Sequence, residues 1–124
     1  MNVVDSSAWL EYFTDGRNAA TFARPIHATT RLVVPSVSLF EVFKRVMTQR
    51  GEDVALEAVA MMRQGRVVPL DDTLALEAAR LSVEHRMPMA DSVILATARA
   101  HRATLWTQDA DFKDLPDVRY LAKA

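Results

Sequence analysis

The sequence contains no cysteine and only three glycines among its 124 residues. The missing cysteine excludes a disulfide framework and any thiolate metal site, which is typical of proteins from reducing compartments. The scarcity of glycine excludes a glycine-rich loop that cradles phosphate groups. No uninterrupted apolar run approaches the roughly 18 residues of a membrane-spanning helix. The first residues also lack the basic region and long apolar run of a signal peptide, so we expect a cytoplasmic protein.

The chain has almost no net charge, because 16 acidic and 15 basic residues leave a formal charge of −1. Bulk electrostatics therefore does not favour binding to a polyanion, and any contact with nucleic acid must come from a local basic patch or from metal ions. Half of the residues are hydrophobic and a quarter are charged, which together with the length predicts a single domain over residues 1–124. The candidate phosphate contacts are Lys44, Arg45, Arg50, Arg99 and Arg102.

The most apolar stretch of the chain predicts a helix at residues 89–100, followed by a short buried strand at residues 103–107. The helix is apolar on nearly every side, and such helices are buried. Asp91 is the exception, because it lies in the first helical turn on the same face as Ile94 and Leu95. A carboxylate in that position is costly unless it is paired or bound to a metal. Asp91 is therefore a candidate site residue.

Short β-branched runs alternate with helical patterns along the chain. This alternation predicts an α/β fold, with a short parallel sheet of about five strands and helices on both of its faces. The crossovers between strands should be right-handed. In sheets of this kind, binding sites form at the carboxyl ends of the strands. The predicted strands cover residues 2–5, 32–35, 66–70, 103–107 and 117–121.

Acidic residues gather at that edge in the predicted arrangement. Asp5 and Asp109 end strands, whereas Glu41 and Asp91 lie near the starts of helices, and Asp111 is close by. Carboxylates without a histidine or cysteine partner are hard oxygen ligands that suit Mg²⁺ or Mn²⁺. Two unit charges about 5 Å apart repel by roughly 3 kcal/mol at an effective dielectric constant of about 20, so such a cluster needs cations or protons. The chemistry that uses it is phosphodiester hydrolysis.

Each acid also has a purely structural interpretation. Asp5 suits a helix N-cap, Asp109 suits a turn cap, and Asp91 complements the helix dipole. Glu41 either closes an S-x-x-E capping box with Ser38 or pairs with the arginine one turn later. The joint position of the four acids at one edge of the sheet favours a site over four separate structural roles.

Four segments of the chain resemble those of a PIN domain, and more narrowly those of a VapC-type toxin ribonuclease from a toxin–antitoxin pair. The segments follow one another in order along the whole length: V-V-D-S-S-A-W-L, V-P-S-V-S-L-F-E-V, M-P-M-A-D-S-V-I-L-A-T-A and L-W-T-Q-D-A-D-F. The resemblance implies a PIN-like three-layer fold and an endoribonuclease that hydrolyses RNA. It also implies a homodimer and inhibition by a cognate, VapB-like antitoxin protein.

The resemblance assigns roles to individual residues as well. It implies that Asp5, Glu41, Asp91 and Asp109 bind Mg²⁺ or Mn²⁺ and are the catalytic acids. Ser6 and Thr107 match positions with hydroxyl side chains near the site, and Asp111 matches a further acidic position of the T-x-D-x-D-F pattern. We treat these three residues as supporting candidates.

Two apolar stripes bear on the question of partners. Trp9, Tyr12 and Phe13 share one face of the first predicted helix, and they belong either to the core or to a contact with a partner. A second stripe consists of Phe40, Phe43 and Met47. A domain of this size has a limited interior, so part of this surface is expected to lie outside the core.

Two alternative functions remain open at this point. A phospho-receiver signalling domain needs adjacent acids after its first strand and a phosphoacceptor aspartate after its third. Here Asp5 is followed by Ser6, while the pair Asp71–Asp72 follows the third predicted strand. The other alternative is a PIN-like module that binds RNA or protein without cleaving. A nuclease assay with and without EDTA separates all three functions.

Overall fold

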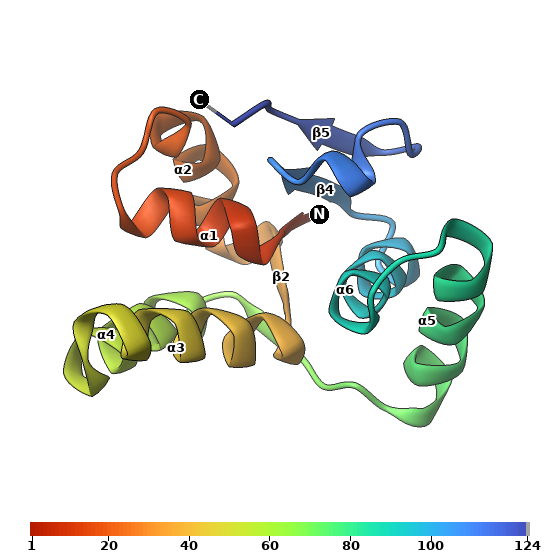
Figure 1. Cartoon of the computed structure of the whole chain (residues 1–124), viewed down its shortest axis with the longest axis horizontal. Coiled ribbons are helices and arrows are strands. Elements are labelled where there is room, and N and C mark those ends of the chain that lie inside the picture. The colour runs from red at the N-terminus through yellow and green to blue at the C-terminus, as the bar shows by residue number, and fades with distance from the viewer. Residues whose placement is uncertain (124) are drawn as a thin grey trace.

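Five parallel strands form one sheet in the order β3-β2-β1-β4-β5. The computed structural model describes residues 1–123 (Figure 1). The predicted α/β fold and its parallel sheet are confirmed, and each strand ends within two residues of its predicted bounds. The strands are β1 (Asn2–Val4), β2 (Leu32–Pro35), β3 (Arg66–Val68), β4 (Thr104–Thr107) and β5 (Val118–Tyr120).

Six α-helices and two short 3₁₀ turns connect the strands. Gly51 ends α3 with a φ of 92°, a backbone conformation that favours glycine, and Asp71 caps α5 by accepting a hydrogen bond from the Leu74 N–H at 2.9 Å. None of the described helices is long and apolar enough to cross a membrane. The helices are α1 (Ser6–Phe13), α2 (Ala19–His27), α3 (Ser36–Arg50), α4 (Glu52–Met62), α5 (Asp72–His85) and α6 (Met89–Ala100), with turns η1 (Thr29–Arg31) and η2 (Ala110–Phe112).

The helices cover the two faces of the sheet as separate layers. In Figure 1, α1 to α4 lie on one side of the strands, and α5 and α6 lie on the other. Successive side chains of a strand point to opposite faces. Accordingly, Val3 packs with α5 and α6, whereas the next residue, Val4, packs with α1 to α4. The same alternation holds for Leu105 and Trp106 in β4, so the central strands are buried on both faces.

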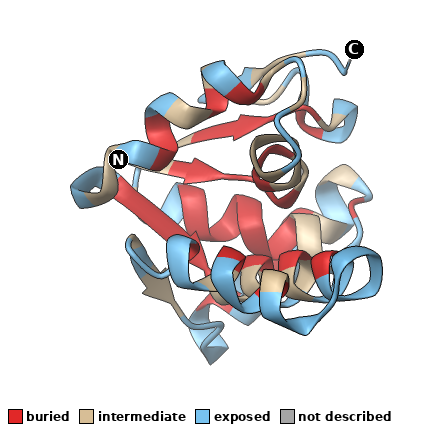
Figure 2. Cartoon of the chain, turned by 90° about the vertical axis from the view of Figure 1, so that its left-hand side faces the viewer, coloured by how far each residue is buried: buried red, intermediate tan, exposed pale blue. Residues whose placement is uncertain are grey.

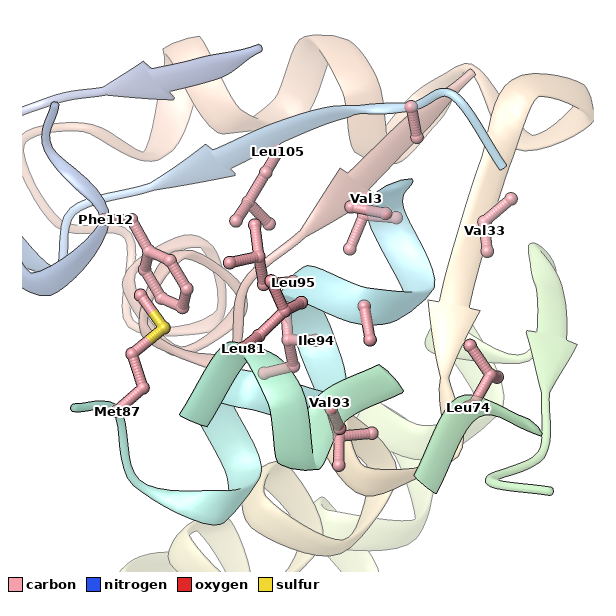
Figure 3. Close-up of a cluster of buried hydrophobic side chains, with 14 residues drawn as sticks. Val3, Val33, Leu74, Leu81, Met87, Val93, Ile94, Leu95, Leu105 and Phe112 are labelled. Carbon is pink, nitrogen blue, oxygen red and sulfur yellow. The ribbon is translucent and has the colours of Figure 1, made fainter. Parts of the chain in front are cut away.

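Helix α6 is the most buried helix, as its apolar pattern predicted. Every residue from Ser92 to Ala98 is buried, and the central strands beside it are buried as well (Figure 2). Figure 3 shows how Ile94 and Leu95 of α6 pack among residues of β1, β4 and α5. The first turn of α6 is therefore held in a fixed position against the sheet, and Asp91 is part of that turn.

Candidate active site

The strand and helix ends place the predicted acids at one edge of the sheet. Asp5 directly follows β1, and Asp109 lies two residues beyond the end of β4. Because β1 and β4 are parallel neighbours, both residues lie at the carboxyl edge. Glu41 belongs to α3, which begins where β2 ends, and Asp91 belongs to the first turn of α6.

Asp5 is a buried carboxylate held by two hydroxyl groups. It is only 2% exposed, and its Oδ2 accepts hydrogen bonds from Ser7 Oγ at 2.6 Å and from Thr107 Oγ1 at 2.7 Å. Burial raises the pKa of Asp5 above its usual value, although the hydrogen bonds from Ser7 and Thr107 act in the opposite direction. Asp5 occupies the N-cap position of α1, but its side chain makes no capping hydrogen bond. The carboxylate therefore points into the site instead of capping the helix.

Thr107 links Asp5 to the acids that follow β4. Its hydroxyl oxygen donates to Asp5 and also accepts a hydrogen bond from the Asp109 N–H at 2.9 Å. Asp109 Oδ1 in turn accepts from the Asp111 N–H at 2.9 Å. Asp109 thus caps η2, as its structural interpretation suggested, and still contributes its carboxylate to the acidic edge.

Glu41 is oriented by α1 and not by a capping box. Ser6 Oγ donates a hydrogen bond of 2.7 Å to Glu41 Oε1. The capping-box interpretation is wrong because α3 begins earlier than that motif requires, at Ser36, with Pro35 as its N-cap. Ser38 is already inside the helix, and its buried hydroxyl makes no hydrogen bond with any part of the chain from residue 1 to 123.

The pKa of Asp91 reflects the negative charges around it. Its pKa is raised to about 7, first by burial and then by the negative charges of four other acids. Four other carboxylates therefore lie within electrostatic reach of Asp91. Those four acids are Asp5, Asp109, Glu41 and Asp111.

Three of the five acids meet the geometric requirement for a shared cation. Asp91, Asp109 and Asp111 each place one carboxylate oxygen within 4.8 Å of the others. Among residues 1–123, the only contact between a basic and an acidic side chain joins His85 to Glu84 at 3.8 Å, so no lysine or arginine pairs with the clustered acids. A concentrated set of hard oxygen donors without a protein counter-charge fits a divalent metal ion. The acidic edge of the sheet can therefore hold a metal.

All seven residues predicted from the sequence lie in or next to the acidic cluster, but their contacts differ. Asp111 joins Asp91 and Asp109 directly, while Asp5 and Glu41 are each tied to a neighbouring hydroxyl group. Ser7, which donates a hydrogen bond to Asp5, was not predicted as a site residue. A serine two residues after an aspartate is a local hydrogen-bonding signal that would have identified it.

The family of the chain follows from a comparison of its sequence with known proteins. Residues 3–118 match the PIN domain family. The chain belongs to the PIN domain family. The match runs from within β1 to the start of β5 and includes all five acids of the candidate site of this PIN domain.

Solved structures with the same fold include toxins and toxin–antitoxin complexes. A toxin–antitoxin complex from Klebsiella pneumoniae contains a chain with a TM-score of 0.83 and 20% identity, with 100% of both chains covered. VapC20 of Mycobacterium tuberculosis, a toxin that cleaves the sarcin–ricin loop, has a TM-score of 0.78 and 18% identity over 94% of this chain and 95% of its own. DNA-bound VapBC from Salmonella typhimurium gives 0.74 and 16%, with 98% of both chains covered. No curated protein matches the sequence.

Proposed function

We propose that this PIN domain is a metal-dependent endoribonuclease toxin that is held inactive by a cognate antitoxin. The observation that carries the proposal is the cluster of five carboxylates without a basic partner among the described residues, in which Asp91 has a pKa of about 7. Membership of the PIN domain family and the similar toxin structures support it. The substrate is RNA, and residues 1–124 act as one domain in the cytoplasm.

The chain's own residues prepare the site for this chemistry. Asp91, Asp109 and Asp111 would hold Mg²⁺ or Mn²⁺, with Asp5 and Glu41 completing the acidic shell. When bound, such an ion neutralises charge on a phosphodiester and lowers the pKa of a water molecule. Asp5 and Glu41 are catalytic acids in this proposal, together with Asp91 and Asp109.

Hydroxyl groups fix the directions of the two acids that reach the cluster from the α1–α3 side. Ser7 and Thr107 hold Oδ2 of Asp5, and Ser6 holds Oε1 of Glu41. Within the described residues, the second oxygen of each carboxylate accepts no hydrogen bond from a side chain. Those two oxygens are therefore the atoms that we assign to water or cation contacts, and Ser6, Ser7 and Thr107 are positioning residues.

A groove between three helices is the surface that we assign to the antitoxin. It runs between α1, α3 and α4, and none of the five clustered acids lines it. Its apolar side chains suit the apolar face of a partner helix, and complexes with antitoxins are known among the similar structures. The apolar lining consists of Leu10, Phe13, Val46, Val54, Ala58 and Met61.

A different surface suits the homodimer. Leu76, Val83 and Met89 are 68%, 82% and 72% exposed, and all three belong to α5 and α6. Large apolar side chains that remain in solvent mark an interaction surface when they gather on one layer of a fold. We assign this layer to a second copy of the chain.

The phospho-receiver alternative has no support in the structure. Asp71 is the exposed N-cap of α5, and Asp72 is the exposed first residue of that helix. Both follow β3, which is an edge strand separated from β4 by β2 and β1. The alternative of a PIN-like module that binds RNA or protein without cleaving is tested by an RNA cleavage assay.

The test of the proposed function is cleavage of RNA by the purified chain with and without a divalent metal. We expect cleavage with Mg²⁺ or Mn²⁺, no cleavage in excess EDTA, and a higher melting temperature when the metal is present. A ligand at about a hundred times its Kd stabilises a fold by about 2.7 kcal/mol. Undiminished cleavage in EDTA would contradict the metal mechanism. A thermal shift without any cleavage would instead favour the non-catalytic module.

A further inference from the structure

Phe40 is a large aromatic side chain that the fold leaves in solvent beside the acidic cluster. It is 64% exposed and directly precedes Glu41 in α3. Lys44 lies one helical turn later, with its Nζ 5.7 Å from the centre of the Phe40 ring. Neither residue contributes to the two cores of the domain. The pair therefore presents an aromatic face and a positive charge together at the edge of the site.

A second aromatic–lysine pair, in which the Tyr120 ring is half-buried, lies on the other side of the acids. Tyr120 ends β5 and is the register partner of Thr107, the residue that holds Asp5. Lys113 Nζ lies 5.9 Å from the centre of the Tyr120 ring, and Lys113 comes two residues after Asp111 in the chain. Tyr120 thus belongs to the same carboxyl edge of the sheet as the acids.

The order of the strands puts the two pairs at opposite ends of the site. Neighbouring strands run β2-β1-β4-β5, and α3 starts where β2 ends. Asp5 follows β1 and Asp109 follows β4, and these two strands lie between β2, which leads into the helix that carries Phe40, and β5, which ends at Tyr120. β2 and β5 are three strand spacings apart, which corresponds to about 14 Å along this edge.

We infer that a single RNA strand crosses the acidic site along this edge, with one unpaired base against Phe40 and another against Tyr120. Lys44 and Lys113 contact the phosphate groups beside those bases. Stacking on aromatic side chains combined with nearby cations is the general way in which proteins hold unpaired nucleic acid. This strand path rests on the proposed ribonuclease function and names the part of the substrate that the domain recognises: single-stranded segments rather than duplex RNA.

Charge favours RNA over a protein helix as the ligand at this place. The chain has a net charge of −1, and five carboxylates would repel a phosphate backbone unless cations stood next to them. The groove beside Glu41 supplies such cations, since Lys44 and Arg45 both line it together with Phe40. The groove assigned to the antitoxin is more apolar and lies between α1, α3 and α4. The linings of the two grooves share only Leu10, so we assign RNA and the antitoxin to neighbouring but different grooves.

The decisive experiment measures RNA binding apart from RNA cleavage. An Asp91→Asn background removes cleavage, and fluorescence anisotropy with a labelled single-stranded RNA oligonucleotide of mixed sequence then reports affinity. We expect Phe40→Ala and Tyr120→Ala each to weaken binding about five- to a hundredfold, while Phe40→Tyr and Tyr120→Phe retain it. The matched control is Leu56→Ala, since Leu56 is an exposed apolar residue of α4. Duplex RNA of the same sequence should bind more weakly than the single strand.

The salt dependence of RNA binding tests whether Lys44 and Lys113 contact phosphate groups, because a purely structural lysine would not change it. Each phosphate contact that is lost should lower the slope of log affinity against log salt by about 0.7 for a single strand. Lys44→Ala and Lys113→Ala should each show this reduction. Arg63→Ala, an exposed cation at the end of α4, should leave the slope unchanged.

The outcomes separate the strand path from the proposed function. If the unsubstituted chain cleaves RNA and the Phe40→Ala and Tyr120→Ala variants bind and cleave it equally well, the strand path is wrong and the ribonuclease stands. If the substitutions weaken RNA binding but the unsubstituted chain never cleaves, the strand path stands and the ribonuclease fails. Loss of antitoxin binding by Phe40→Ala without any change in RNA affinity would overturn the strand path and assign Phe40 to the protein partner.

Discussion

Asp91 illustrates how one residue can be costly for folding and useful for function. Its carboxyl group is fixed at the head of the most buried helix, where burial and four negative charges raise its pKa to about 7. An acid with a raised pKa prefers its protonated form, so in the metal-free protein its ionisation works against the fold.

The first prediction concerns Asp91→Asn. Because the folded pKa of about 7 lies above the unfolded value of 3.8, wild-type stability falls as pH rises between these values, and the asparagine variant avoids this loss. At pH 8 and without metal, we expect the variant to be more stable by about 1 kcal/mol, a figure reduced for partial exposure. RNA cleavage should be abolished. Urea denaturation across the pH range checks the difference in stability.

Two results would count against this assignment of Asp91. If the residue only complements the helix dipole, the asparagine variant would be slightly less stable at every pH and fully active. A stability difference that does not grow between pH 4 and pH 7 would show that its carboxyl group titrates normally in the fold.

The second prediction concerns Ser38, whose buried hydroxyl makes no hydrogen bond with any described residue. A buried polar group without a partner costs about 1–3 kcal/mol, so Ser38→Ala should keep the free energy of unfolding or raise it by about 1 kcal/mol. A capping box would predict the opposite, a loss of about 1 kcal/mol. Thermal unfolding of the two proteins decides between them, and a clear loss of stability would restore the capping interpretation.

At the scale of an element, α6 connects the core with the acidic site. Its side chains from Ser92 to Ala98 are buried between the sheet and α5, and this packing holds the first turn at the carboxyl edge. The helix contributes to stability along its length and to function only at its start, where Asp91 lies.

The third prediction tests this packing with Ile94→Ala. Ile94 is 0% exposed, and truncation of a buried isoleucine costs about 2–5 kcal/mol through lost burial and the cavity left behind. The control is Leu56→Ala in α4, where the side chain is 51% exposed and the cost should stay within about 0.5 kcal/mol. Equal urea midpoints for the two variants would mean that α6 is not the core helix that the structure shows.

At the scale of the whole molecule, the two predicted apolar stripes divide between the core and the surface. Trp9, assigned by its spacing to either the core or a partner contact, is a core residue with 0% exposure. Tyr12 and Phe13 remain half-buried beside it, and Phe13 lines the groove between α1, α3 and α4. Phe40 of the second stripe is exposed near the acids.

The fourth prediction concerns assembly. We expect the purified chain to sediment as a homodimer at tens of micromolar, and to form a complex with the product of the neighbouring gene. Met61→Glu places a charge in the groove between α1, α3 and α4, so it should weaken the antitoxin complex at least tenfold while RNA cleavage continues. A chain that stays monomeric and does not bind that product would rule out the quaternary proposal without affecting the metal site.

The sequence by itself determined the fold and the candidates for the site. The hydrophobic pattern of the sequence predicted all five strands and the buried helix. A helix that is apolar on every side is stable only in the interior of the protein. The carboxyl ends of parallel strands meet at one edge of the sheet, so the predicted strands already place Asp5 and Asp109 near each other.

The hydrogen-bond partner of each carboxylate oxygen is known only from the tertiary structure. The hydrogen bond from Ser6 to Glu41 joins residues that are 35 positions apart, and it depends on how α1 packs against α3. The hydrogen bond from Thr107 to Asp5 joins residues that are 102 positions apart. Local patterns cannot report such distances, and for Ser38 the local pattern was misleading because α3 starts at Ser36. The position of Tyr120 beside the acids follows from strand order, which the chain acquires only when distant segments pair.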